Sequence, residues 1–209
     1  MRVVKEAEER KNEILDAAEM LFGNKGFDNT STNDILKEVG IARGTLYYHF
    51  KSKEDILDAM IERMTERMTA AAVHIAQDQS ISVLERLSQA IIALNVSGDV
   101  GTEVMEQMHR PQNALMHQKV QERLLAGIVP VIAGLTEEGI VQGIFHTDYP
   151  VQAAEMLMVY SNEAFDSRRI QSEAEKQQRL LGFIYNAERI LGMKQGALQE
   201  TILAIFQSI

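Results

Sequence analysis

Apolar residues recur along most of the chain at the spacing of an α-helix. From Ile14 to Phe22 they follow the i, i+4, i+7, i+8 pattern that lines one face of a helix. The chain contains three prolines, and no stretch shows the apolar–polar alternation of a half-buried strand. We therefore expect an all-α fold. Beyond the first third of the chain, helices are predicted near residues 81–96, 103–110, 114–139, 150–166, 172–192 and 196–208.

Capping signals divide the first third of the chain into short helices. Gly-Asn-Lys-Gly at residues 23–26 ends the first helix, because glycine is common just past a helix C-terminus. Ser31, with an aspartate three residues later, forms a capping-box pattern that starts a second helix, and Gly40 ends it. A third helix is predicted over residues 43–49, and a second capping-box pattern at Ser52 starts a long helix.

The third of these helices has two different faces. If Leu46 points inward, Phe50 does so too, whereas Gly44 and Tyr48 lie on the opposite side. A short helix, the turn Gly-Ile-Ala and this second helix have the spacing of a helix-turn-helix, whose second helix enters the major groove of DNA. The exposed hydroxyl and basic groups are of the kinds that bind base edges and phosphates. The alternative is ordinary helix packing with a partly buried phenol.

The charge of the chain is unevenly distributed. The net charge is −9, which by itself argues against a nucleic-acid partner. Residues 1–53, however, contain nine basic and nine acidic residues, which leaves 12 basic and 21 acidic residues in 54–209. The acidic excess therefore belongs to the larger C-terminal part, and the composition is compatible with a DNA-binding N-terminal part.

Cysteine usage and hydropathy indicate where the protein acts. The chain has no cysteine, which excludes disulfides and thiolate metal sites and is typical of a reducing compartment. Residues 1–15 are too charged for a signal peptide. The longest apolar runs, such as residues 127–135, are shorter than the about 20 residues that cross a bilayer. We expect a cytoplasmic protein without a membrane partner.

Residues 21–57 closely resemble the DNA-binding head of the TetR/AcrR family of transcriptional regulators. The similarity covers the Gly-Phe pair after the first helix, the threonine-rich start of the second, and Gly-Thr-Leu-Tyr-Tyr-His-Phe-Lys-Ser-Lys. In this family the head is followed by a helical domain that dimerises and binds an effector. The chain departs from the family at Ala42, where serine or threonine is common, so the hydroxyl that could cap the helix and contact a phosphate is missing there. The resemblance implies that Arg43, Gly44, Thr45 and Tyr47 approach bases and that Thr32, Tyr48, His49 and Lys53 hold the sugar-phosphate backbone.

Methionines mark a candidate effector site. A flexible methionine wall with a few polar groups suits a small hydrophobic ligand. The helix that contains Pro130 is expected to bend, which leaves room for one. The alternative is that the methionine stripes are ordinary core. The candidate residues are Met60, Met64, Met68, Met105, Met108, His109, Asn113 and Met116.

The sequence shows no pattern typical of an enzyme or a metalloprotein. His109 and His117 lack the tight ligand spacing of a zinc helix, so surface or capping roles are favoured for them. No nucleophile elbow, phosphate loop or paired-carboxylate motif is found. We expect no catalytic residues, no metal and no cofactor.

Two late helices carry apolar stripes that suit a dimer interface. Pairing both helices with their symmetry mates gives an isologous four-helix interface between two copies of the chain. The alternative is that both stripes face the chain's own core. The predicted interface residues are Leu157, Ser161, Phe165, Leu180, Ile184 and Leu191.

The expected protein is thus a homodimeric, ligand-responsive transcriptional regulator. We expect a helix-turn-helix DNA-binding domain over residues 1–53 and a helical effector-binding and dimerisation domain over 54–209. Its partners are a double-stranded palindromic operator and a small hydrophobic effector that releases it, which makes it a repressor. Two alternatives remain open: a DNA-binding protein of the same fold controlled by a protein partner or by no effector, and a helical scaffold whose head no longer binds DNA.

Overall fold

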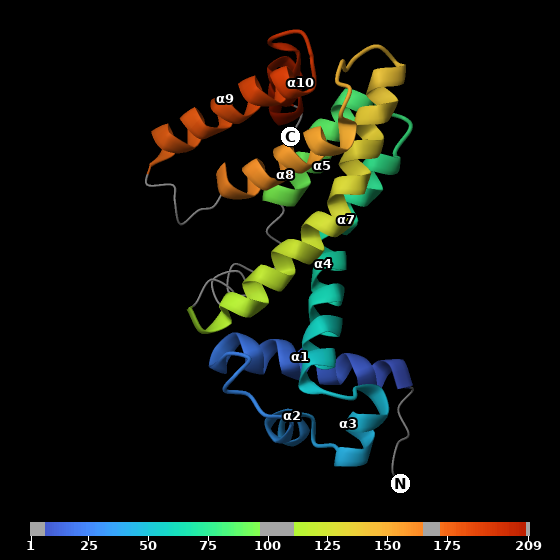
Figure 1. The fold of residues 1–209 in the computed structure, drawn as a ribbon, viewed down its shortest axis with the longest axis vertical. Helices are drawn as coiled ribbons and strands as arrows, with labels where there is room; N and C mark the ends of the chain where they lie inside the picture. Colours follow the sequence, from blue (N-terminus) through green and yellow to red (C-terminus); the bar gives the residue numbers. More distant parts are fainter. Residues whose placement is uncertain (1–6, 97–110, 165–171, 208–209) are drawn as a thin grey trace. The chain divides into compact units, whose positions relative to one another are not determined.

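A computed structural model describes residues 7–96, 111–164 and 172–207, and these residues form an all-α fold (Figure 1). The predicted helices after residue 80 are confirmed within a few residues of their expected ends, except that the one near 103–110 lies outside the described residues. The elements are α1 (Ala7–Lys25), α2 (Thr32–Val39), α3 (Arg43–His49), α4 (Lys53–Gln77), α5 (Val83–Val96), the short 3₁₀ helix η1 (Pro111–Asn113), α7 (Ala114–Val141), α8 (Pro150–Ala164), α9 (Glu173–Ile190) and α10 (Ala197–Gln207).

The described chain divides into two compact units. Unit 1 comprises residues 7–67 and 111–123, and unit 2 comprises residues 68–96, 124–164 and 172–207. Helices α4 and α7 each contribute residues to both units. The domain boundary predicted between residues 53 and 54 stays a prediction, because the compact units divide the chain in a different way.

In unit 1, the first helices pack around a small aromatic and aliphatic core. Helix α1 packs on α2, and Phe22 lies edge-to-face against Phe27 with ring centroids 5.3 Å apart. Leu46 of α3 is 1% exposed, so this one side chain anchors the helix in the core. The other fully buried members include Ile14, Ile35, Ile56, Leu57, Met60 and Met64.

The helix boundaries of unit 1 follow from local capping. Ser31 caps α2 and forms the predicted capping box with Asp34, and Gly40 ends that helix at a left-handed φ of 69°. Hydrogen bonds from Ser31 hold the pKa of the Asp34 carboxyl below its usual value. Ala42 precedes α3 and makes no side-chain cap, as the missing hydroxyl implied.

The start of α7 is fastened within unit 1 by polar contacts. Asn113 is 1% exposed, and its amide nitrogen donates to the carbonyl oxygen of Gly23 in α1 at 3.1 Å. Lys119 pairs with Asp58 of α4 at 2.5 Å. One turn further along both helices, an arginine of α7 pairs with a glutamate of α4 in the same way. These contacts join α7 to the helices that precede it in the chain.

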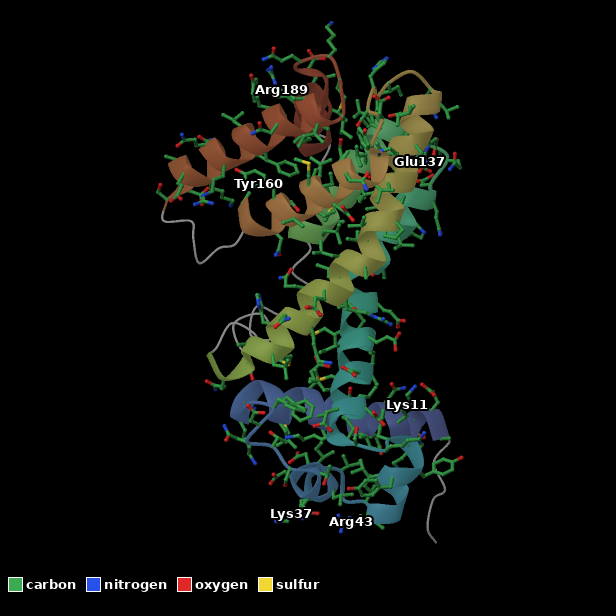
Figure 2. The ribbon with its side chains drawn as sticks, in the orientation of Figure 1. Lys11, Lys37, Arg43, Glu137, Tyr160 and Arg189 are labelled. Atoms are coloured by element: carbon green, nitrogen blue, oxygen red, sulfur yellow. The ribbon has the colours of Figure 1, made fainter. Side chains whose placement is uncertain are left out.

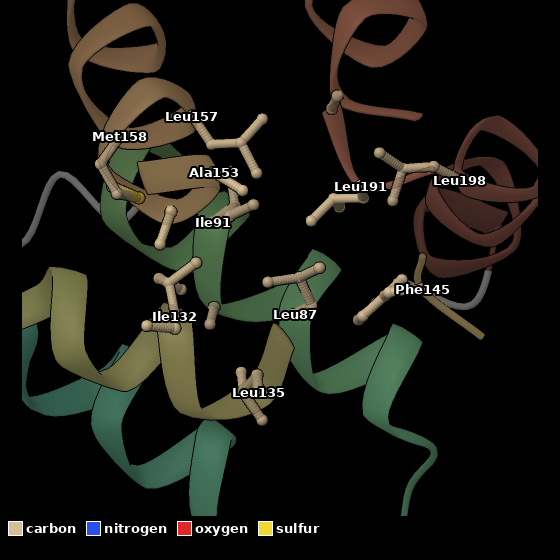
Figure 3. Close-up of a cluster of buried hydrophobic side chains, with 14 of the residues drawn as sticks. Leu87, Ile91, Ile132, Leu135, Phe145, Ala153, Leu157, Met158, Leu191 and Leu198 are labelled. Atoms are coloured by element: carbon tan, nitrogen blue, oxygen red, sulfur yellow. The ribbon is translucent and has the colours of Figure 1, made fainter. Parts of the chain in front are cut away.

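In unit 2, helices α5, α7, α8, α9 and α10 share one hydrophobic core. Figure 3 shows side chains of α5, α7, α8 and α10, with residues of the connecting segments, converging on one cluster. Arg86 is 2% exposed and is held by the carboxylate of Glu138 and the carbonyl of Ala76, which satisfies a charge that burial makes costly when it is unpaired. The labelled members of the cluster are Leu87, Ile91, Ile132, Leu135, Phe145, Ala153, Leu157, Met158, Leu191 and Leu198.

The segment between α7 and α8 packs closely against two glycines, one in α7 and one after α9. A Cβ atom at Gly139 would lie 2.1 Å from the ring of Phe145, so this ring needs a residue without a side chain beneath it. Gly192 has a φ of +62° and would place a Cβ atom 2.1 Å from the carbonyl oxygen of His146. The backbone N–H of His146 also donates to the carbonyl of Leu191 at 2.8 Å, which joins this segment to the end of α9.

Candidate nucleic-acid interface

Helix α3 presents the face that its sequence pattern predicts. Leu46 and Phe50 point inward and are 1% and 6% exposed, whereas Tyr48 is 78% exposed. Gly44 is also exposed, and a Cβ atom placed on it would meet nothing within 4 Å. The protein itself therefore gives no steric reason for a glycine at this position. Thr45 lies partly buried on the flank of the helix.

Three of the predicted DNA-binding residues form one cluster. The guanidinium of Arg43 lies 5.6 Å from the centre of the Tyr47 ring, one helical turn away. Hydrogen bonding from Arg43, and then from Thr32 at the start of α2, lowers the pKa of the Tyr47 phenol. The ring remains 42% exposed. The cluster thus joins the two helices of the helix-turn-helix on their outer side.

The aromatic residues at the end of α3 are in contact with each other. The Tyr48 ring meets the His49 ring edge-to-face with centroids 5.0 Å apart, and His49 lies at 6.4 Å from the buried ring of Phe50. His49 is partly buried. The Tyr48 ring therefore packs on His49 at one edge, and its exposed phenol can contact a partner.

Lys53 has a role that the sequence did not indicate. Its ammonium donates to the backbone carbonyl oxygen of Phe27 at 2.8 Å and lies 4.1 Å from the centre of the Phe27 ring. Lys53 therefore joins α4 to the segment after α1. An ammonium has three donors, so the remaining N–H groups are compatible with the predicted phosphate contact.

Basic side chains lie on the side of unit 1 that α2 and α3 form. Figure 2 shows Lys37 and Arg43 on this side, and both are exposed, as is Lys51. Lys25 is partly neutralised by Asp34 at 3.7 Å. Exposed cations beside an exposed recognition helix are the arrangement that attracts a polyanion.

The residues predicted for an effector site have different surroundings. Met60, Met64, Asn113 and Met116 are buried in unit 1, and the amide of Asn113 is engaged with α1. Met68 is partly buried and belongs to unit 2. Met105, Met108 and His109 lie outside the described residues. The assignment of these eight residues to an effector site stays a prediction.

Most of the residues predicted for the dimer interface are buried within unit 2, and their assignment to an interface stays a prediction. Leu157, Ser161, Ile184 and Leu191 are at most 4% exposed, and Leu180 packs against the same core. Phe165 lies outside the described residues. The described members of this set therefore pack largely within their own chain.

The outward faces of α8 and α9 carry apolar residues that the sequence analysis missed. The two helices pack against each other, and Tyr160 stacks on Phe183 with ring centroids 6.2 Å apart (Figure 2 labels Tyr160). The available signal was a second apolar stripe at i, i+3, i+4 on α8, beside the stripe that is buried. We call the following residues the outer α8–α9 face: Met156, Val159, Tyr160, Leu181 and Tyr185, each at least 44% exposed.

Two family models match the chain. Residues 14–60 match the model described as bacterial regulatory proteins of the tetR family. Residues 97–182 match the model described as the tetracyclin repressor-like C-terminal domain. The chain belongs to the TetR family. This TetR-family regulator therefore has both parts of the family's architecture, a helix-turn-helix head followed by a helical C-terminal domain.

Relatives and solved structures agree with this membership. The fatty acid metabolism regulator protein of Bacillus subtilis is 28% identical over 155 residues, which cover 70% of this chain and 76% of that protein. An HTH-type transcriptional regulator of Staphylococcus aureus is 46% identical over 59 residues, 28% of this chain and 32% of that protein. The crystal structure of RolR in complex with resorcinol has the same fold, with a TM-score of 0.64 at 17% identity and 94% of both chains covered.

Membership fixes the general properties of this TetR-family regulator. TetR-family proteins are soluble DNA-binding transcription regulators, not enzymes. In the described part of the chain, no group of three or more histidine, aspartate or glutamate side chains is placed to hold a metal ion. Helix α7 is long and apolar enough to cross a bilayer, but core helices of soluble proteins meet the same criterion.

Proposed function

We propose that the protein is a cytoplasmic, homodimeric repressor that leaves a palindromic operator when a small hydrophobic effector binds. The observation that carries the proposal is the outward face of α3, where Gly44 is open to solvent and Tyr48 is 78% exposed. Tyr48 meets His49 at a ring edge and leaves most of its surface exposed beside the exposed Gly44 and Arg43, so this face can contact an external partner. The major groove of DNA admits an α-helix of this kind.

A palindromic operator is bound by two DNA-binding heads, one from each protomer. In helix-turn-helix dimers the two recognition helices enter successive major grooves about 34 Å apart, and operator symmetry mirrors protein symmetry. We assign the contact between protomers to the outer α8–α9 face. Its five large apolar side chains are exposed on two helices that pack together, and burial of such a patch against a second copy removes apolar surface from water.

Support for a hydrophobic effector comes from the relatives. One is named a fatty acid metabolism regulator, and a protein of the same fold was crystallised with resorcinol. An effector acts by binding more tightly to the conformation that has low operator affinity, so each ligand lowers the affinity for the other by the same factor. A thermal-shift screen of acyl and phenolic compounds, followed by operator titration with each hit, tests this part of the proposal.

The variant Gly44→Ala tests DNA binding without disturbing the head. Alanine is favoured over glycine inside a helix by about 1 kcal/mol, and a Cβ atom meets nothing within 4 Å, so the variant should fold at least as stably. The added methyl group should weaken operator binding, because α3 approaches the bases closely. Tyr48→Ala should weaken binding as well. Tyr149→Ala is the matched control, since this tyrosine is 69% exposed but lies in unit 2.

The measurement is fluorescence anisotropy on an operator selected from random duplexes by the wild-type protein, with circular dichroism as the check on folding. Weaker binding by both α3 variants and normal binding by the control is the expected result. If the wild type selects no duplex, or if both α3 variants bind like the wild type, the assignment of DNA binding to this head is wrong.

A further inference from the structure

Arg43 occupies an electrostatically unfavourable place in α3. It is the first residue of a helix whose first turn contains no acidic side chain and whose N-terminus has no side-chain cap. A cation at this end opposes the helix dipole. The side chain is exposed, and its guanidinium lies 5.6 Å from the centre of the Tyr47 ring.

Tyr47 connects Arg43 to the neighbouring helix. Its ring lies beneath the guanidinium, and hydrogen bonding from Arg43 and then from Thr32 of α2 lowers the pKa of its phenol. Thr32 is partly buried at the first position of a capped helix, so it provides a fixed reference point. The direction of the arginine is therefore set from two helices, through one phenol.

This arrangement suits the reading of a base. In helix-turn-helix complexes the N-terminal residues of the recognition helix contact base edges, and arginine on the O6 and N7 atoms of guanine is the commonest specific contact. A free arginine carries considerable rotamer entropy, which binding must overcome. A guanidinium has five N–H donors, so hydrogen bonding to a phenol leaves donors for guanine.

We infer that Tyr47 and Thr32 are positioning residues that aim the Arg43 guanidinium at one guanine of the operator, and that these three side chains together determine one base pair of specificity. The inference rests on the proposed operator binding. It gives Tyr47 and Thr32 a different role from the direct base and backbone contacts that the family resemblance implies. Arg43 is the residue that reads the base, and the other two act through it.

The test measures discrimination, not affinity alone. The wild-type protein selects an operator, and its affinity is then compared between that operator and a set in which each base pair is substituted in turn. Arg43→Lys keeps the charge but loses the planar guanidinium. Tyr47→Phe keeps the ring but loses the hydroxyl, and Thr32→Val keeps the side-chain shape but loses the hydroxyl. Tyr149→Phe in unit 2 is the matched control for loss of a phenol hydroxyl.

Arg43→Lys should reduce discrimination at one base pair by about tenfold or more. Tyr47→Phe and Thr32→Val should reduce discrimination at the same base pair. The double variant Arg43→Lys, Tyr47→Phe should lose no more discrimination than Arg43→Lys alone, because the effects of residues that act as a unit are not additive. Tyr149→Phe should match the wild type at every position.

Several results would overturn the inference. Loss of discrimination by Tyr47→Phe at a different base pair means that Tyr47 reads a base itself. A uniform loss of affinity in Thr32→Val means a backbone contact, and additive losses in the double variant mean independent contacts. If the wild type selects an operator and the variants discriminate as it does, only the inference fails. If the wild type selects none, the proposed function fails as well.

An ultraviolet titration of the free protein gives a readout that does not depend on DNA. Hydrogen bonding from Arg43 and then from Thr32 lowers the pKa of Tyr47, so the titration should contain one step at lower pH than is usual for a phenol. That early step should be absent in Tyr47→Phe and should move to higher pH in Arg43→Gln. An unchanged titration in Arg43→Gln would show that the arginine does not hold the phenol, and the inference would be wrong.

Discussion

Truncation of Leu181 on the outer α8–α9 face should weaken the dimer without weakening the fold. Leu181 is 54% exposed in the single chain, so about half of its side chain remains to be buried by a partner. Full burial of a leucine contributes about 1.5–3 kcal/mol, and the remaining half therefore contributes about 1 kcal/mol. An isologous interface uses each residue twice, so Leu181→Ala should cost the dimer about 2 kcal/mol.

This cost corresponds to a dissociation constant about 10- to 30-fold higher. Sedimentation velocity over a dilution series measures it, and circular dichroism should show unchanged helix content, because alanine favours helix at least as strongly as leucine. The matched control is Val141→Ala, an apolar residue that is 87% exposed at the end of α7. The reasoning is refuted if Leu181→Ala leaves the dissociation constant unchanged or if the control raises it equally.

The neighbouring residue Ile184 distinguishes the two faces of α9. It is 4% exposed in the core of unit 2, and a charge there has no partner. Ile184→Glu should therefore unfold unit 2 and should not give a folded monomer. If this variant is instead a stable, helical monomer, the stripe that contains Ile184 forms the dimer interface.

Three further predictions concern the stability of the fold. Asn113→Ala should lower the free energy of unfolding by about 1–3 kcal/mol in urea titrations, because a buried carbonyl of α1 loses its donor. Glu188→Gln should cost about 1–3 kcal/mol by the same assay, since its buried carboxylate accepts the backbone N–H groups at the start of α10; no change would contradict this. The folded-state pKa of Asp34 is lowered by Ser31, so its contribution is present above the unfolded pKa of about 3.9 and is lost as the pH falls through the folded value; melting temperatures of Ser31→Ala should fall less steeply than those of the wild type below about pH 4.

Helix positions were predictable because the residues at the helix ends determine where each helix begins and ends. The capping box at Ser31 and the left-handed Gly40 depend on the residues beside them, and both are present as expected. The inward and outward faces of α3 were also readable, because only one set of apolar residues, Leu46 and Phe50, competes for the core.

The face of α8 and α9 that lies inward could not be read in the same way. Both helices carry two apolar stripes, and periodicity alone does not say which one packs inside the chain. That choice depends on the shape of α5, α7 and α10, which supply the rest of the core.

Residues that act across helices were the hardest to place. The Arg43–Tyr47 pair is visible in the sequence as an i, i+4 spacing, but the contribution of Thr32 depends on how α2 meets α3. Asn113 was selected as a polar residue within an apolar region, and only the fold shows that its amide holds α1.

The sparse anchoring of α3 has an evolutionary consequence. Of the seven residues of this helix only Leu46 is buried, and the helix before it is capped by residues of its own. Substitutions on the outer side of α3 therefore leave the core of the head intact. Gene duplicates of such a regulator can acquire new target sites through a few surface changes, without passing through misfolded intermediates.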